Sequence, residues 1–389
     1  MRADDIGATL EQLRGAGLYR QMRLIESGQG SRVVMDGREV VLLCSNDYLG
    51  LASHPGVRAA AARAAEAWGA GAGASRLVSG NTTLQRDLER ELAEFKGYDA
   101  CVLFGSGYLA NTGVIPALVG RGDVILSDAL NHASIVDGCR QSRAETIVYD
   151  HCDLGSLADG LGRADGRATL IVTDAVFSMD GDLAPLQGIV ALARRHRALV
   201  LVDEAHATGV IGPGGRGLVA ELGLEREVDV AIGTLSKALG SYGAFACCSL
   251  ALRELLVNRA RTLIFSTGLP PASVAAASAA LAVLRTTPEL VDQLHRNSRL
   301  LRAELAAGGF DVSPGEMPIV PLVIGDPQDT MALCEAALEK GLFAQAIRPP
   351  TVPDGTSRLR LVVMATHTPD DVRHAAAVLA AARPSRTEG

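Results

Sequence analysis

Between residues 101 and 249 the chain alternates short, continuously apolar runs with segments long enough to form helices. Continuous apolar runs are typical of strands that are buried on both faces, and intervening helices connect parallel strands. The pattern therefore predicts an α/β fold in which helices cover both faces of a mostly parallel sheet. The predicted strands are 101–104, 123–127, 169–176, 198–204, 228–234 and 243–249.

The segments on either side of this region show different patterns. Before it, the sequence predicts a helix over 8–20, strands over 31–35 and 40–43 joined at Asp36-Gly37, and two helices ending near 68 and 95. After residue 284, the alternation gives way to a smaller α+β pattern. Its predicted helices are 288–307, 328–341 and 369–382, and its predicted strands are 319–324 and 358–363.

Chemically useful side chains follow five of the predicted strands. In parallel sheets ligands bind beyond the carboxyl ends of the strands, so groups that follow successive strands meet at one edge. These groups are glycine, imidazole, hydroxyl, carboxylate and amine. Five such groups at one sheet edge are poorly explained as ordinary surface residues without a function. They occur in the stretches 105–108 (GSGY), 131–132 (NH), 177–180 (FSMD), 203–206 (DEAH) and 234–237 (TLSK).

Lysine is rare in this chain. Of 37 basic residues only three are lysines, Lys96, Lys237 and Lys340, and the rest are arginines. Lysine, unlike arginine, can lose its proton and act as a nucleophile. Lys96 and Lys340 each precede a glycine, where helix C-termini favour positive charge. Lys237 has no such explanation and is therefore a candidate catalytic residue.

Composition excludes several classes of function. The chain has 389 residues, 48% apolar and 21% charged, as expected of a globular protein with a large core. A net charge of −7 without a basic block argues against nucleic acid or a membrane as partner. The N-terminal stretch is acidic and lacks the apolar region of a signal peptide. Seven irregularly spaced cysteines indicate a reduced, cytoplasmic protein, and no metal site is predicted.

Single motifs in this sequence leave alternatives open. The stretch GSGYLA (105–110) resembles a loose dinucleotide fingerprint, so a nicotinamide-dependent dehydrogenase is one alternative and a protein without a cofactor is another. The string DEAH (203–206) has no phosphate-binding loop to accompany it, which excludes nucleoside triphosphate chemistry. His151 and Cys152 are adjacent but lack evident partners, and we interpret them as structural or surface residues.

The combined groups fit one cofactor. Pyridoxal 5′-phosphate (PLP) requires a lysine for covalent attachment, a carboxylate at the pyridine nitrogen and a cradle for its phosphate. Lys237, Asp203 and the amides that open the segment after Gly105 would supply these three elements. A neighbouring imidazole such as that of His132 or His206 can stack on the ring or bond to it.

A family resemblance extends this interpretation. The chain resembles the α-oxoamine synthases, which are fold-type I PLP-dependent transferases, from about residue 18 to residue 367. The resemblance implies a large α/β domain over 44–283 with a mostly parallel seven-stranded sheet, a small α+β domain over 284–389, and an N-terminal segment over 1–43. The matching motifs are SNDYLG (45–50), GSGY (105–108), NHAS (131–134), VFSMDGD (176–182), DEAHATG (203–209), TLSKALG (234–240) and FSTGLPP (265–271).

The family joins an amino acid to an acyl thioester with loss of carbon dioxide. The stretch IRPPTVPDGTSRLR (347–360) and the short chain look most like the members that join L-alanine to a pimeloyl thioester. Their product, 8-amino-7-oxononanoate, is a biotin precursor. The glycine-using members, 2-amino-3-oxobutyrate CoA ligase and 5-aminolevulinate synthase, are the alternative. The resemblance also implies a homodimer with sites completed across subunits, and the acyl carrier is either coenzyme A or an acyl carrier protein.

The resemblance implies a role for each matching residue. Lys237 would hold the cofactor and act as base, Asp203 would pair with the pyridine nitrogen, and His132 would stack on the ring. Two departures from the family pattern, Glu204 for Asp and Ser236 for Gly, leave these positions intact. The remaining implied roles are contacts to the ring oxygen by Ser178 and His206, to the phosphate by Gly107, Tyr108, Thr234, Ser266 and Thr267 (the last two from the neighbouring subunit), to the amino acid carboxylate by Asn46 and Arg360, and to the acyl substrate by Arg20 and Thr351.

Overall fold

The computed structural model describes residues 5–383, which form two compact units. Unit 1 takes in the described residues up to Gly50, the short stretch Met179–Gly181, and the described residues from Asp292 onward. Unit 2 comprises Leu51–Ser178 and Asp182–Val291. The N-terminal segment, which the sequence analysis kept separate, therefore shares a unit with the C-terminal segment, and the first four residues of the acidic N-terminal stretch lie outside the described residues.

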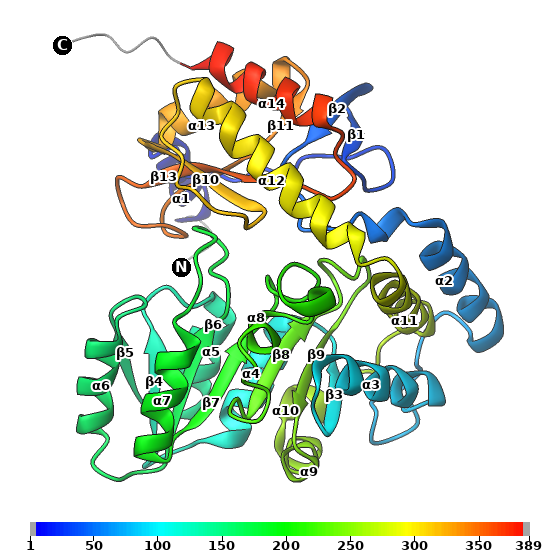
Figure 1. Ribbon diagram of the computed structural model, residues 1–389, viewed down its shortest axis with the longest axis vertical. Helices are drawn as coiled ribbons and strands as arrows, with labels where there is room; N and C mark the ends of the chain where they lie inside the picture. The colour runs from blue at the N-terminus through cyan, green and yellow to red at the C-terminus, as the bar shows by residue number, and fades with distance from the viewer. Residues whose placement is uncertain (1–4, 384–389) are drawn as a thin grey trace. The chain divides into compact units, whose positions relative to one another are not determined.

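Unit 2 contains the predicted sheet, with seven strands in the order β3-β9-β8-β7-β6-β4-β5 (Figure 1). Strand β9 runs antiparallel to both of its neighbours, and all the other pairs are parallel. The mostly parallel seven-stranded sheet is thus confirmed. The strands are β3 (Ala100–Phe104), β4 (Val124–Asp128), β5 (Glu145–Tyr149), β6 (Thr169–Asp174), β7 (Leu199–Asp203), β8 (Val230–Thr234) and β9 (Ala244–Cys248).

Helices cover both faces of this sheet. As a result, every residue of β3, β4, β6, β8 and β9 is buried. Among the helices, α4 packs against β8 and β9, and α7 packs against β7. The helices of this region are η1 (Leu51–Ser53), α2 (Pro55–Trp68), α3 (Thr83–Lys96), α4 (Gly107–Leu118), α5 (Ala133–Ser142), α6 (Leu154–Arg163), α7 (Leu186–His196), η2 (Pro213–Gly215), α8 (Leu218–Glu221), α9 (Leu250–Arg259), α10 (Arg261–Ile264), α11 (Pro271–Thr286) and α12 (Glu289–Ala307), the last of which continues into unit 1.

Sequence signals set where several of these helices begin. Helix α2 starts at Pro55, and the side chain of the preceding His54 accepts a hydrogen bond from the amide of Gly56. Helix α3 starts with a reciprocal capping box between Thr82 and Gln85. These two helices end within one residue of their predicted ends.

Sheet topology places five strand ends together. Strands β4, β6, β7 and β8 are parallel neighbours, and β3 points the same way because it and β8 both oppose β9. Register places Asp174, the last residue of β6, beside Asp203, the last residue of β7. The segments that follow these five strands therefore leave the sheet at one edge, as the sequence predicted.

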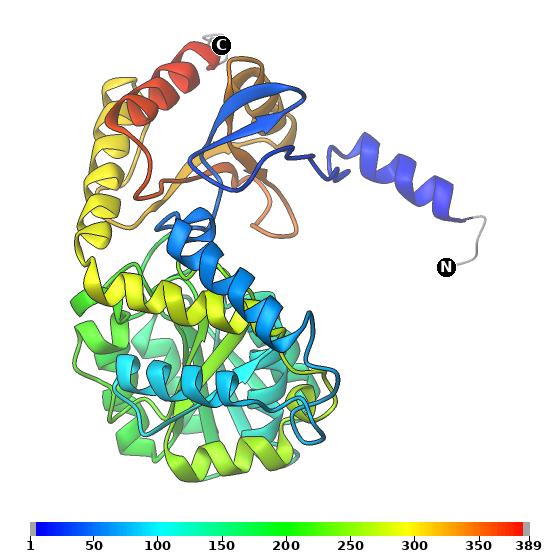
Figure 2. The ribbon, with the colours of Figure 1, turned by 90° about the vertical axis from the view of Figure 1, so that its right-hand side faces the viewer.

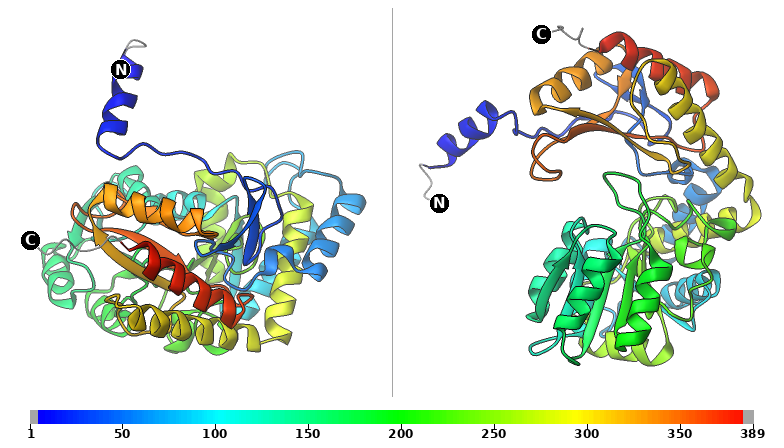
Figure 3. Two further views of the ribbon diagram at one scale, coloured as in Figure 1. Left: turned by 90° about the horizontal axis from the view of Figure 1, so that it is seen from above. Right: turned by 60° about the vertical axis from the view of Figure 1, so that its left-hand side comes forward.

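Unit 1 contains two three-stranded sheets, ordered β1-β2-β11 and β10-β13-β12. The predicted hairpin is present, and its turn residues Asp36 and Gly37 have φ values of 49° and 68°, as a two-residue hairpin turn requires. Helix α13 packs against all three strands of the second sheet (Figure 3). The elements are β1 (Arg32–Met35), β2 (Arg38–Leu42), β10 (Ile319–Gly325), β11 (Leu342–Phe343), β12 (Gln345–Ile347), β13 (Ser357–Val362), α13 (Pro327–Glu339) and α14 (Pro369–Ala382).

Helix α1 (Asp5–Gly15) differs most from its prediction. It ends five residues earlier than expected, and Gly17 follows with a φ of 67°, so the chain around Arg20 is not helical. The helix buries none of its residues and projects away from the rest of unit 1 (Figure 2). Within residues 5–383 no single helix is both long and apolar enough to cross a bilayer. Helices α11 and α12 reach that length and hydropathy only when they are taken together, and the chain bends sharply between them.

Candidate active site

Lys237 lies in a tight turn directly after β8. The turn is closed by hydrogen bonds from the amide of Gly240 to the carbonyl of Lys237 and from the amide of Leu235 to the carbonyl of Gly243. Gly240 has a φ of 55°, and a Cβ added there would come within 2.2 Å of the Ala52 amide nitrogen. Only glycine fits at that position, so the backbone around the lysine is fixed.

The Lys237 amine meets an imidazole. Its Nζ lies 2.9 Å from Nε2 of His206, which is carried by the segment after β7. Two strand ends that are neighbours in the sheet thus bring together a potential nucleophile and a group that can exchange a proton with it.

Asp203 is buried and held from two sides. Its Oδ1 accepts the amide of Ala205 at 2.8 Å, and its Oδ2 accepts the Asn111 side-chain amide of α4 at 2.7 Å. A carboxylate oxygen has two acceptor positions, so both oxygens retain capacity for a further donor. Asp203 is therefore oriented and can still receive a charged N–H group from a ligand.

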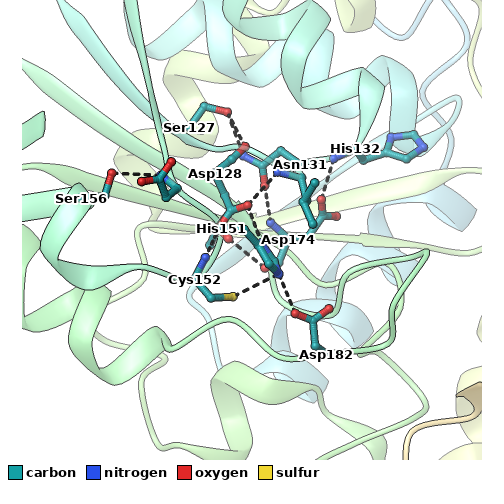
Figure 4. Close-up of polar contacts among 12 residues, drawn as sticks. Ser127, Asp128, Asn131, His132, His151, Cys152, Ser156, Asp174 and Asp182 are labelled. Atoms are coloured by element: carbon teal, nitrogen blue, oxygen red, sulfur yellow. Dashed lines mark hydrogen bonds and ion pairs between the residues drawn. The ribbon is translucent and has the colours of Figure 1, made fainter. Parts of the chain in front are cut away.

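His132 precedes α5 and belongs to the same network. Its amide donates to Oδ2 of Asp174 at 2.7 Å (Figure 4). Its Nδ1 lies 2.7 Å from the hydroxyl of Ser134. Burial lowers the pKa of His132, although the charge of Asp203 opposes that shift. The ring is thus favoured in its neutral form, which suits stacking on an aromatic ligand.

Asp174 supports this arrangement from β6. Burial raises the pKa of Asp174 well above its usual value, and the neighbouring carboxylate of Asp203 raises it further. Its backbone amide donates to Oδ1 of Asn131 at 2.9 Å (Figure 4). The segment that carries His132 is consequently tied to β6 through both Asn131 and Asp174.

The start of α4 provides backbone donors at the same edge of the sheet. Ser106 caps the helix by accepting the amide of Leu109, and Gly107 and Tyr108 form its first turn. The first amides of a helix have no partner within the helix, so they can bind an anion such as a phosphate. Thr234 is buried, and its hydroxyl donates to the carbonyl of Gly243. The hydroxyl oxygen of Ser236 lies 2.8 Å from that of Thr234, and Ser236 is exposed.

Three further predicted residues lie elsewhere in unit 2. Ser266 and Thr267 follow α10 and line a small pocket together with Gly105, which belongs to the loop before α4. Thr267 also forms an isolated bridge with Ser75. Ser178 lies four residues after the end of β6, immediately before the chain enters unit 1.

The remaining predicted residues lie in unit 1 and form two pairs. Arg360, buried on β13, donates from Nη1 to Oδ1 of Asn46 at 3.0 Å. Arg20 and Thr351 line one cavity of about 390 Å³, within the usual range for a ligand pocket. Arg348 lines the same cavity, and burial together with the charge of Arg20 lowers its pKa.

Comparison with known proteins identifies the family. The chain matches the model of the aminotransferase class I and II family over residues 38–379. It is 53% identical over 380 residues to the 8-amino-7-oxononanoate synthase of Geobacter sulfurreducens, covering 96% of this chain and 97% of that one. The chain belongs to the 8-amino-7-oxononanoate synthase family.

Solved structures agree on the fold and the cofactor. A structure of SPT (serine palmitoyltransferase) with PLP matches with a TM-score of 0.93 at 35% identity, covering 98% of this chain and 97% of that one. The 8-amino-7-oxononanoate synthase of Francisella tularensis matches with a TM-score of 0.76 at 27% identity, covering 88% and 97%. The chain is thus a fold-type I, PLP-dependent C-acyltransferase, and the dehydrogenase and cofactor-free alternatives are wrong.

Members of the 8-amino-7-oxononanoate synthase family use PLP, and the residues described above have the groups needed to bind it. The amine of Lys237 lies against His206, the buried carboxylate of Asp203 has acceptor positions left over, and the amides of α4 open at the same sheet edge. An attachment point, a partner for a protonated ring nitrogen and an anion cradle are all present.

Sequence reasoning missed the residues that support this site. Asn111 lies inside α4, where no strand end marks it, and it reaches both Asp203 and Ser134. Asp174 lies inside the predicted strand 169–176, whereas the observed strand β6 ends at it, so the prediction did not mark it as a residue of the sheet edge.

The helix-end interpretation of Lys96 is confirmed but incomplete, and the interpretation of His151 and Cys152 as lacking partners was wrong. Lys96 does end α3, but it is fully buried and its Nζ pairs with Oε2 of Glu204 at 2.5 Å, next to Asp203 in sequence. His151 and Cys152 do not lack partners. His151 lies between the carboxylates of Asp128 and Asp182, and the amide of Cys152 donates to Asp128 (Figure 4).

Proposed function

We propose that this enzyme joins L-alanine to a pimeloyl thioester, releasing carbon dioxide and the free thiol and giving 8-amino-7-oxononanoate for biotin synthesis. The observation that carries the proposal is the contact of Lys237 with His206 at the strand edge that also holds Asp203 and His132. The names of relatives about half identical over nearly the whole chain support the choice of substrates.

Unit 2 would hold the cofactor. We assign covalent attachment to Lys237, the ring nitrogen to Asp203, one ring face to His132, and the ring oxygen to His206 and Ser178. The phosphate would bind the amides of Gly107 and Tyr108, with hydroxyls from Thr234 and, across a dimer, Ser266 and Thr267. When bound, PLP supplies an electron sink for negative charge that develops at the substrate Cα.

Lys237 and His206 would manage the protons. The amine of Lys237 lies 2.9 Å from the imidazole of His206, so it has an immediate partner for proton exchange. The neutral ring of His132 can donate one hydrogen bond to the acyl carbonyl without bringing a positive charge. The pairing of the Asp174 carboxylate with the amide of His132 keeps that ring in place.

Unit 1 would bind the substrates. We assign the carboxylate of alanine to Arg360 and Asn46, because a guanidinium can hold a carboxylate through two parallel hydrogen bonds. The acyl chain would occupy the cavity lined by Arg20 and Thr351, whose arginines suit an acyl group that ends in a carboxylate. The enzyme would act as a homodimer. We place it in the cytoplasm, and its seven free cysteines suit a reducing compartment.

A product assay tests the substrate assignment. Holoenzyme is supplied with alanine and pimeloyl-CoA, with glycine and succinyl-CoA, with glycine and acetyl-CoA, and with serine and palmitoyl-CoA, and the condensed amine is measured by mass spectrometry. The alanine and pimeloyl-CoA pair should give the highest kcat/KM. Faster turnover of either glycine pair, or of the serine pair, would refute the alanine assignment; repeating the alanine arm with a pimeloyl-acyl carrier protein identifies the carrier.

The three lysines allow a direct test of the attachment site. Borohydride reduction followed by peptide mass mapping should place the reduced cofactor on the peptide that contains Lys237. Lys237→Ala should abolish both the label and the product, whereas Lys340→Ala, at an exposed helix end, should change neither. A label on Lys96 or Lys340 would contradict the proposed chemistry.

A further inference from the structure

Four side chains that the proposed reaction does not use meet at the same edge of the sheet (Figure 4). Asp128 ends β4, His151 and Cys152 lie in the turn after β5, and Asp182 lies in the segment after β6. His151 Nδ1 is 2.8 Å from Asp128 Oδ1, and its Nε2 is 2.6 Å from Asp182 Oδ2 and 3.6 Å from Cys152 Sγ. Nε2 of His151 therefore faces both a thiol and a carboxylate, and ligand atoms of Asp128, His151 and Cys152 lie within 4.8 Å of one another.

We propose that these residues form a binding site for a divalent cation of the zinc class. His151 Nε2, Cys152 Sγ and a carboxylate oxygen of Asp182 are the ligands, and Asp128 accepts the proton of Nδ1. Imidazole, thiolate and carboxylate are the donors that zinc binds in proteins, and a water molecule completes the tetrahedron. The cysteine count alone did not suggest a metal, because only one of the three ligands is a cysteine.

The separation of the nitrogen and sulfur ligands agrees with tetrahedral zinc. With a Zn–N bond of about 2.0 Å and a Zn–S bond of about 2.3 Å, nitrogen and sulfur should be about 3.5 Å apart. The observed separation of Nε2 and Sγ is 3.6 Å. Nitrogen and oxygen should be about 3.3 Å apart, so Asp182 must withdraw by under 1 Å, which its partly exposed side chain on a loop permits.

An outer partner for the ligand histidine is already in place. Histidines that bind metals almost always donate their other N–H to a carboxylate or carbonyl, which fixes the tautomer and the orientation of the ring. Asp128 is buried and is itself held by the amides of Leu130 and Cys152 at 2.8 and 2.9 Å. Phe177 packs edge-on against the same imidazole with ring centroids 4.4 Å apart.

Two further observations favour a ligand at this position. Oδ1 of Asp182 is buried and has no hydrogen-bond partner among residues 5–383, although such atoms are normally satisfied. Cys152 has a φ of 54°, a strained value for a residue with a side chain, and its amide bond to Asp128 holds it there. The thiol is thus held beside the imidazole at a cost in backbone energy.

Metal binding to the reduced, PLP-loaded enzyme tests the proposal. Isothermal titration with ZnSO4 should show one site per chain, and X-ray absorption at the zinc edge should show one sulfur at about 2.3 Å with nitrogen or oxygen at about 2.0–2.2 Å. A first shell without sulfur would overturn the assignment, because zinc bound to the cofactor or to surface carboxylates has that shell. Binding no tighter than that of magnesium would overturn it as well.

Matched variants locate the site. Cys152→Ser keeps the size of the side chain and should weaken zinc binding at least tenfold, and Asp182→Asn should weaken it less. His196→Gln removes an exposed histidine and Cys44→Ser removes a half-buried thiol, and neither should alter the affinity. Zinc should raise the melting temperature of the wild type but not of Cys152→Ser; equal affinity and equal shift in these two proteins would refute the proposal.

Discussion

The buried pair of Lys96 and Glu204 gives the sharpest stability prediction. Both side chains are at most 1% exposed, and they link the end of α3 to the residue after Asp203. Lys96 also donates to the carbonyl of Arg216, and Oε1 of Glu204 accepts the amide of Val219 at 2.9 Å. A Cβ added at Gly217 would lie 2.4 Å from Oε1 of Glu204, so no spare space surrounds the pair.

Replacing Lys96 by methionine keeps most of the volume and removes the charge. The Glu204 carboxylate is then left buried with one remaining protein donor, a change that typically costs about 3–5 kcal/mol. For a domain of this size each kcal/mol lowers the melting temperature by about 2–4 °C, so we expect a drop of roughly 6–20 °C. Urea unfolding followed by circular dichroism, with the transition of unit 2 fitted separately, measures the change.

The second half of the experiment isolates the pair. Adding Glu204→Gln to Lys96→Met removes the uncompensated charge, so the double variant should be at least about 2 kcal/mol more stable than Lys96→Met alone. Lys340→Met is the matched control, since that lysine is exposed at the end of α13, and it should change stability by less than about 0.5 kcal/mol. A loss below about 1 kcal/mol for Lys96→Met, or simple additivity in the double variant, would refute the reasoning.

Three further substitutions test individual contacts. Arg360→Lys loses a bidentate fork to the substrate carboxylate and should raise the KM for alanine roughly 10–100-fold, the equivalent of about 1.5–3 kcal/mol; an unchanged KM would remove Arg360 from the substrate site. Asp174→Asn should cost less than about 1 kcal/mol, because the raised pKa of Asp174 disfavours its charge, whereas Asp174→Leu orphans the amide of His132 and should cost more; equal losses in urea unfolding would contradict this. Burial lowers the pKa of His367, so its neutral ring contributes stability above pH of about 6.5 that is lost as the pH falls; His367→Gln should flatten this acid loss in urea titrations, and an unchanged slope would count against it.

The sequence was sufficient to predict the large sheet because its strands are continuous apolar runs. Strand β5 did not stand out, since it lies at the edge of the sheet and three of its five residues are exposed. Strands β11 and β12 have two and three residues, and they exist only by pairing with β2 and β13. Short strands of this kind form only by pairing with other strands, so the local sequence pattern does not predict them.

The same distinction separates the site residues that were predicted from those that were not. Lys237, Asp203, His206 and His132 directly follow buried strands, and topology brings such positions together regardless of detail. Residues that act through a partner carry no comparable signal. Asn111 supports Asp203 from the middle of a helix 92 residues earlier in the chain, so only the folded structure shows the contact.

Long-range pairing also explains why the burial of Lys96 was not predicted. A lysine in the last turn of a helix is well accounted for by the helix dipole, and Lys96 does occupy that position. The dipole favours a charge at the surface, however, and supplies no reason for burying it. Burial requires an opposite charge in the interior, which here comes from a glutamate 108 residues away that also fixes the amide of Val219. The departure at Glu204 and the lysine at position 96, in a chain where most basic residues are arginines, are therefore two halves of one interaction.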